Sequence, residues 1–174
     1  MEAIASRKRI NPSKDAAPNA LAGKVALVMG SSSGIGAAIV RELSARGASV
    51  VINYGWPDLE RTVNDPWKSL KSPWIAVEGD ISTTSGPSHL VQAAVDKFGK
   101  LDIIVNNAAK ATLAKVEDTN VDLWDASMTT NVRGPFLECQ AALPHLPTKS
   151  EGGGGRIINI TSAVSTDPEV QQLA

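Results

Sequence analysis

The 174-residue chain carries 17 Lys and Arg against 18 Asp and Glu, so its formal net charge is −1, and 43% of its residues are hydrophobic. This balance predicts one globular domain and argues against nucleic-acid or membrane-surface partners, which need a strong positive charge. No apolar run approaches the ~20 residues that cross a bilayer. The single cysteine, Cys139, cannot form an internal disulfide, which favours a cytoplasmic setting.

The polar segment 1–20 contains two prolines and no apolar core of a signal peptide, so we predict a flexible N-terminal tail there and a folded domain over 21–174. Within that domain, apolar runs of strand length alternate with stretches of helical periodicity. The predicted strands cover 24–30, 49–53, 74–77, 102–106 and 156–160, and the predicted helices cover 35–46, 87–98 and 121 to about 143, with a poorer helical stretch from residue 58.

Repeated βαβ units of this kind predict an α/β fold, namely a doubly wound parallel sheet of the Rossmann type in a three-layer α/β/α arrangement. Ligands of such sheets bind beyond the carboxyl ends of the strands. The functional residues are therefore expected where the predicted strands end.

The sequence Gly-Ser-Ser-Ser-Gly-Ile-Gly at 30–36 lies between the first predicted strand and the first predicted helix. In such a turn Gly30 permits the sharp reversal, Gly34 lets the backbone approach a diphosphate, and Gly36 lets the helix pack against the sheet. The helix N-terminus offers unpaired N–H groups to the phosphates. A glycine-rich turn without a ligand is the alternative, but the strand–turn–helix context favours a dinucleotide site.

Four further motifs follow in order: Asp80-Ile81 after the third predicted strand, Asn106-Asn107-Ala108-Ala109 after the fourth, Thr130-Asn131-Val132 in the long helix, and Ile160-Thr161-Ser162 at the end of the fifth strand. Each has an ordinary structural explanation, because Asp and Asn form turns and Ser caps helices. Those explanations do not account for all four motifs occurring together at these positions.

Taken together, these residues resemble the short-chain dehydrogenase/reductase family over about 21–174. The resemblance implies an oxidoreductase that transfers hydride between a nicotinamide cofactor and a small carbonyl or alcohol substrate, in a protein that is usually a homo-oligomer. It implies catalytic roles for Ser162, which would bond the substrate carbonyl, and for Asn131, which would anchor a proton-relay water. The implied cofactor-binding residues are Gly30, Ser32, Ser33, Gly34, Ile35, Gly36, Asn53, Tyr54, Asp80, Ile81, Asn107, Ala108 and Ala109.

The end of the second predicted strand favours NADP(H) over NAD. NAD-binding relatives usually place a carboxylate there to bond the ribose 2′-hydroxyl, whereas this strand ends in Asn53 and Tyr54, and the first acid is Asp58. Hydroxyls at 31–33 are also expected nearby, although no arginine stands in the usual positions to clamp the 2′-phosphate. The two histidines lack metal-ligand spacing with Cys139, so no metal site is predicted.

The family's general acid/base pair, Tyr-x-x-x-Lys, follows the serine in relatives, but no tyrosine or lysine follows Ser162 here. Met29 and Ala109 also stand where the family usually has threonine and glycine. We therefore expect a chain that is truncated relative to the family and that does not oxidise NADPH by itself. Three hypotheses stay open: an NADP(H)-dependent ketone reductase or alcohol dehydrogenase, a non-catalytic dinucleotide-binding module, and a fragment of a longer enzyme.

Overall fold

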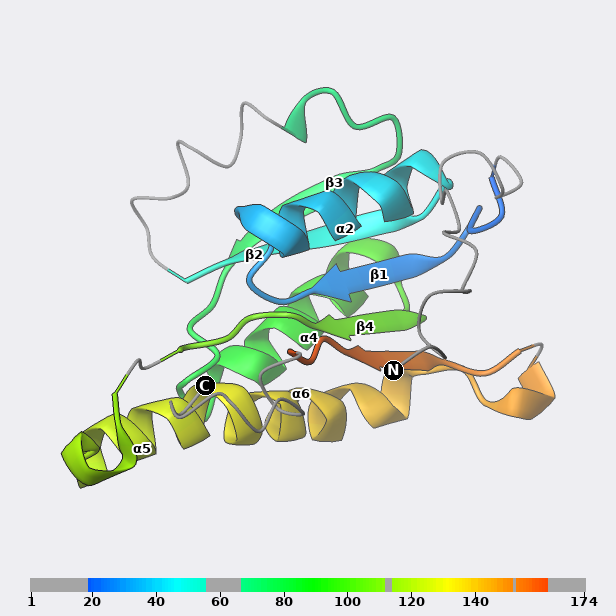
Figure 1. The fold of residues 1–174 in the computed structure, drawn as a ribbon. Coiled ribbons are helices and arrows are strands. Elements are labelled where there is room, and N and C mark those ends of the chain that lie inside the picture. Colours follow the sequence, from blue (N-terminus) through cyan, green and yellow to red (C-terminus); the bar gives the residue numbers. More distant parts are fainter. Residues whose placement is uncertain (1–18, 56–66, 112–113, 152, 163–174) are drawn as a thin grey trace, which may run out of the picture.

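A computed structural model describes residues 19–55, 67–111, 114–151 and 153–162. Five parallel strands form one sheet in the order β3-β2-β1-β4-β5, as Figure 1 shows. The strands are β1 Val25–Val28, β2 Ser49–Tyr54, β3 Trp74–Glu78, β4 Ile103–Asn106 and β5 Arg156–Asn159. All five predicted strands and the doubly wound parallel sheet are confirmed.

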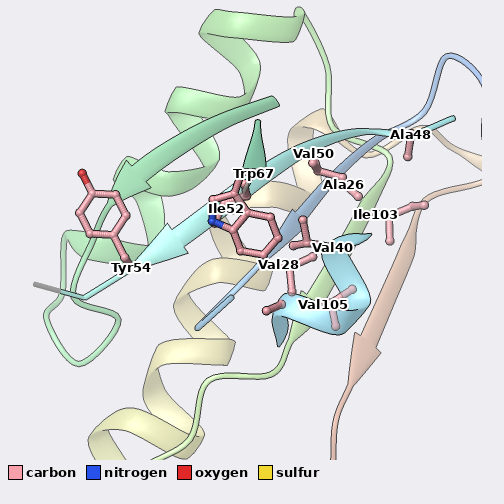
Figure 2. Close-up of a cluster of buried hydrophobic side chains, with 11 residues drawn as sticks. Ala26, Val28, Val40, Ala48, Val50, Ile52, Tyr54, Trp67, Ile103 and Val105 are labelled. Atoms are coloured by element: carbon pink, nitrogen blue, oxygen red, sulfur yellow. The ribbon is translucent and has the colours of Figure 1, made fainter. Parts of the chain in front are cut away.

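Helices cover the two faces of the sheet, and side chains alternate between these faces along each strand. Val28 and Ile52 pack in one buried cluster with Val40 of α2 (Gly34–Ala45) and with Trp67, and Figure 2 shows this cluster. Leu27 and its neighbours on the other face pack with α4 (Gly86–Phe98) and α6 (Gly134–Ala142). The fold is therefore the expected three-layer α/β/α arrangement (Figure 1).

The sheet is buried at its centre and open at the β5 edge. Both β1 and β4 are buried along their whole length, whereas every residue of β5 is exposed. The adjacent residues Ile157 and Ile158 are 40% and 44% exposed, and they point to opposite faces of the sheet. Both faces of β5 are therefore accessible to solvent. Among the described residues, no helix is long and apolar enough to cross a membrane.

The predicted long helix from residue 121 is helical throughout but is not one regular α-helix. α5 (Val121–Met128) continues into a π-helical turn, Thr129–Arg133, and then into α6. Pro135 follows closely, and its missing N–H removes the α-helical hydrogen bond to the carbonyl of Asn131. Gly134 N–H bonds instead to Thr129 O, five residues back. The predicted helical stretch is confirmed, the π-turn within it was not predicted, and this wider turn contains Asn131.

Three short 3-10 turns complete the described structure: Val116–Asp118, Leu143–His145 and Lys149–Glu151. Most of the predicted N-terminal tail and most of the poorer helical stretch from residue 58 lie outside the described residues. These two predictions therefore stay predictions.

Candidate dinucleotide site

The residues singled out from the sequence gather at one edge of the sheet. All five strands are parallel, so their carboxyl ends lie at the same edge. Gly30 follows β1, Asn53 lies at the end of β2, Asp80 follows β3, Asn107 follows β4 and Ser162 follows β5. The topology therefore places the five strand-end motifs along one continuous edge.

The N-terminus of α2 lies at this edge and has no side-chain cap. Ser33 is the N-cap residue, its hydroxyl makes no capping hydrogen bond, and the first turn contains no acidic residue. The hydrogen bond from Ala37 N–H to Ser33 O, 3.1 Å long, opens the helical ladder, so the amides before Ala37 have no partner within the helix. Ser33 and Ile35 are exposed. These amides and the helix dipole can therefore receive an anionic group.

Two glycines hold the loop tightly against the sheet. Gly30 has φ +61°, which L side chains rarely adopt, and a Cβ there would lie 2.7 Å from Ala108 Cβ. A Cβ on Gly36 would lie 2.5 Å from Gly30 O and 2.6 Å from Asn107 Nδ2. By contrast, nothing lies within 4 Å of the Cβ position of Gly34 (φ +57°). The first and third glycines are required by packing, and the second leaves open space in front of the loop.

Asn107 joins the end of β4 to the glycine loop. Its Nδ2 donates to Met29 O at 3.0 Å and to Gly30 O at 3.1 Å. Met29, which stands where the family usually has a threonine, is fully buried among apolar side chains, and its N–H bonds to Val105 O. In this chain the loop is thus tied to β4 by backbone hydrogen bonds and the Asn107 amide.

Asn53 is buried and makes hydrogen bonds to three neighbouring backbone groups. Its Oδ1 accepts from Gly30 N–H at 2.9 Å, and its Nδ2 donates to Tyr54 O at 3.2 Å and to Gly79 O at 2.9 Å. Its own N–H donates to Ser31 Oγ, and this hydroxyl donates to Val28 O. Both amide hydrogens of Asn53 are used in these bonds. We therefore expect Asn53 and Ser31 to shape the loop from behind rather than to contact a ligand.

Replacing Asn53 with alanine is expected to destabilise the fold, because Gly30 N–H and Gly79 O would lose their side-chain partner. Unpaired buried groups cost roughly 1–3 kcal/mol each, so urea denaturation should show about 3 kcal/mol less unfolding free energy. Gln92→Ala is the control, since Gln92 Nε2 bonds only to Asp96 on the exposed face of α4. Equal stability of N53A and Q92A would contradict this role.

Tyr54 and the segment after β3 lie beside this junction. Tyr54 is 7% exposed, and Figure 2 shows its hydroxyl at the end of the ring that points away from Trp67. Asp80 is exposed, and its Oδ1 accepts from Ser82 N–H at 2.8 Å, so it caps a turn. Ile81, at 7% exposure, packs into the core. Asp80 is thus fixed in place and accessible.

The two residues with implied catalytic roles come from the π-turn and from the end of β5. Asn131 Oδ1 accepts from Lys110 N–H at 2.8 Å, and its Nδ2 donates to Lys110 O at 2.9 Å. Ser162 is exposed just beyond β5. The chain leading to it lies beside β4, because Ile160 N–H bonds to Asn106 O at 2.9 Å. Asn131 is therefore anchored to the segment that follows Ala109, while Ser162 lies at the strand edge.

Glu138 was not predicted from the sequence and is the most unusual polar residue of the described structure. It is fully buried on the stripe of α6 that also contains Gly134 and Ala142. Neither of its carboxylate oxygens has a hydrogen-bond partner, and burial raises its pKa to about 8. Its spacing of four residues from two small residues was the signal that could have indicated a buried position.

No group of three or more His, Cys, Asp or Glu side chains that could hold a metal ion occurs in the part of the chain that the structure describes. The glycine loop and the N-terminus of α2 present backbone amides and hydroxyls at this edge. These are suitable donors for a phosphate-containing ligand.

Comparison with known proteins supports this picture. The family model for short chain dehydrogenases matches residues 24–174. An uncharacterized oxidoreductase of Staphylococcus epidermidis is 37% identical over 145 residues, which are 83% of this chain and 60% of that protein. The chain thus spans about 60% of the length of this relative.

Solved structures agree with the sequence comparison. A blue fluorescent protein from a metagenomic library, in complex with NADPH, superposes with a TM-score of 0.81 at 32% identity, covering 88% of this chain and 61% of that one. A short chain dehydrogenase from Burkholderia cenocepacia, in complex with NADP, gives a TM-score of 0.78 at 35% identity, covering 87% and 60%. From its ordered motifs, its sheet topology and these matches, the chain belongs to the short-chain dehydrogenase/reductase family.

Proposed function

We propose that this chain forms the NADP(H)-binding part of an oxidoreductase that reduces a ketone or oxidises a secondary alcohol. The observation that carries the proposal is the uncapped N-terminus of α2, which begins at a glycine loop on the carboxyl edge of the parallel sheet. A dinucleotide diphosphate fits that edge because its charge complements the helix dipole and its oxygens accept from the free amides.

The proposed binding surface follows the edge from β3 to β5. The amides of residues 33–36 would hold the diphosphate, while Asp80 and Ile81 would flank the adenine. The segment Asn107–Ala109 would border the nicotinamide ribose, and Ser32 adds a hydroxyl beside the loop. When bound, NADP(H) supplies the hydride, and the protein supplies binding, orientation and electrostatics.

The preference for NADP(H) rests on charge at the end of β2. Asn53 is neutral and faces the backbone, and Tyr54 follows it. A carboxylate at that position would repel a 2′-phosphate, so its absence lowers the cost of binding NADP(H). The similar structures with bound NADPH and NADP support this choice.

For catalysis, we propose that Ser162 donates a hydrogen bond to the substrate carbonyl. We also propose that Asn131, in the π-turn, anchors a proton-relay water. A general acid must also deliver a proton to the carbonyl oxygen, and such a group contributes about 10²–10⁴ in rate. No tyrosine or lysine follows Ser162 in the 174 residues. We therefore expect the 174 residues by themselves to bind the cofactor without measurable NADPH oxidation. Reduction of a ketone or oxidation of a secondary alcohol is proposed for the whole protein.

Titration of thermal stability with NADPH and NADH tests the binding site. Ligand at about 100 times its Kd adds roughly 2.7 kcal/mol to stability, and NADPH should produce a given shift at a lower concentration than NADH. No shift with either would contradict the proposed site. An equal response to both would contradict the preference. A non-catalytic dinucleotide-binding module would also show a shift in thermal stability without turnover of any ketone. Turnover of a ketone by the whole protein therefore separates the oxidoreductase from the binding module.

The lone cysteine is consistent with a cytoplasmic location, which we propose for the protein.

A further inference from the structure

The π-turn between α5 and α6 contacts two loops of the proposed cofactor site, one after β3 and one after β4. Asn131 in the π-turn bonds to both backbone groups of Lys110, after β4. Two residues later, Arg133 Nη2 donates to Ser82 O, after β3, at 2.7 Å. The five-residue π-turn therefore contacts the loops on both sides of the glycine loop.

The contact with the loop after β3 has a second component. A Cβ on Gly134 would lie 2.7 Å from Ile81 O, so the helix backbone comes as close to this loop as a glycine allows. Two successive carbonyls of this loop therefore contact the helix. Ile81 O packs against Gly134, and Ser82 O accepts a hydrogen bond from Arg133. The π-turn contains one residue more than an α-helical turn. This extra residue changes the direction in which Gly134 and the residues after it face relative to Asn131.

The loop itself is closed by local hydrogen bonds and is packed at its far end. Thr83 N–H and Thr83 Oγ1 both donate to Asp80 O, and Gly86 N–H donates to Thr83 Oγ1. A Cβ on Gly86 would overlap Asp80 O. These hydrogen bonds connect Asp80 to Thr83 and Gly86, and Arg133 binds the same loop at Ser82 O.

We propose that Arg133 is a positioning residue for the adenine half of the cofactor, acting through the Asp80–Ser82 turn. The inference rests on the proposed function, because it takes Asp80 and Ile81 as the adenine-flanking residues. Arg133 does not touch the ligand; its guanidinium fixes the carbonyl of Ser82 and thereby the direction in which the turn presents Asp80. The π-turn then sets the spacing between the adenine side, through Arg133, and the nicotinamide side, through Asn131.

The test uses 2′,5′-ADP, which carries the adenine half alone, and NADPH, both measured by calorimetric titration. R133A should weaken 2′,5′-ADP binding by up to about fivefold, because the ligand would then have to order a turn that one hydrogen bond of roughly 1 kcal/mol had held in place. R133K, which keeps a cationic N–H donor, should recover most of the affinity. K97A is the matched control, because Lys97 is an exposed cation on α4 away from the loop.

Amide hydrogen exchange gives a readout that does not depend on a ligand. R133A should speed exchange in the segment 80–86 and leave 108–111 unchanged, while N131A should do the reverse. G134A, which pushes on Ile81 O, should also raise exchange in 80–86. A fall in the unfolding free energy of R133A no larger than the loss of this one exposed hydrogen bond would show that the affinity loss is not a general loss of stability.

The outcomes separate the two proposals. Wild-type binding of 2′,5′-ADP with unchanged affinity and exchange in R133A overturns the role of Arg133 alone. Failure of the wild-type chain to bind either nucleotide overturns the proposed function and, with it, this inference. A loss in R133A that R133K restores and K97A does not reproduce supports the positioning role.

Discussion

Replacing Gly36 with alanine is expected to cost most of the affinity for NADPH. The new Cβ would lie 2.5 Å from Gly30 O, 2.6 Å from Asn107 Nδ2 and 2.8 Å from Ser31 Cα. These atoms belong to the loop that forms the proposed diphosphate site, so relief of the clash must move the loop or the N-terminus of α2. Overpacking of this kind costs about 1–3 kcal/mol, and calorimetric titration should show NADPH binding weakened roughly 10- to 100-fold.

Gly99→Ala is the control for this experiment. Gly99 ends α4 with φ +76°, and nothing lies within 4 Å of its Cβ position. Alanine there strains the backbone by about 1 kcal/mol without touching the loop. G99A should therefore lose some stability and bind NADPH as tightly as wild type. Equal affinities in G36A and wild type would show that the close approach of α2 to the loop is not needed for binding.

Glu138 is expected to make the stability of the fold depend on pH. Its pKa is raised by burial to about 8 in the folded chain, from an ordinary value of 4.5. The folded state therefore binds this proton more tightly than the unfolded state. The stability that the group contributes is fully present below about 4.5 and falls as the pH rises to about 8, by roughly 1.4 kcal/mol for each unit. Above pH 8 this contribution changes no further.

Glu138→Gln removes the titration and keeps the size of the side chain. At pH 7, E138Q should be about 2–4 kcal/mol more stable than wild type, and the difference should vanish near pH 4. Urea denaturation at several pH values measures both. Glu117→Gln is the control, because Glu117 is exposed. The unfolding free energy of E117Q should vary with pH in the same way as that of wild type. Parallel pH profiles of wild type and E138Q would show that the carboxyl is not buried and unpartnered as the structure places it.

The order and type of the elements could be predicted from the sequence, because the strands are short apolar runs and the helices are periodic. The site edge followed from topology alone, since parallel strands end together. These features depend on local pattern and on chain direction. They do not require knowledge of which side chains meet.

What could not be predicted depends on contacts between distant elements. The sequence predicts that Asn53 binds the cofactor, but Gly30 N–H after β1 and Gly79 O after β3 lie within hydrogen-bond distance of its side chain, so its amide turns inward. Glu138 reads as a surface charge on a helix, but the stripe of small residues around it faces the interior. The residues of the π-turn do not distinguish it from an α-helix. Only Pro135, just after the turn, indicates that the helix is interrupted.

The proposed cofactor site depends on the amides at the N-terminus of α2, which would receive the diphosphate of the dinucleotide. Amide chemical-shift mapping of ¹⁵N-labelled protein during NADPH addition tests it directly. We expect the largest shifts at residues 32–36, further shifts at 80–82 and 107–109, and little change on the outer face of α4. Saturable NADPH binding that leaves the amides of 32–36 unmoved would contradict it.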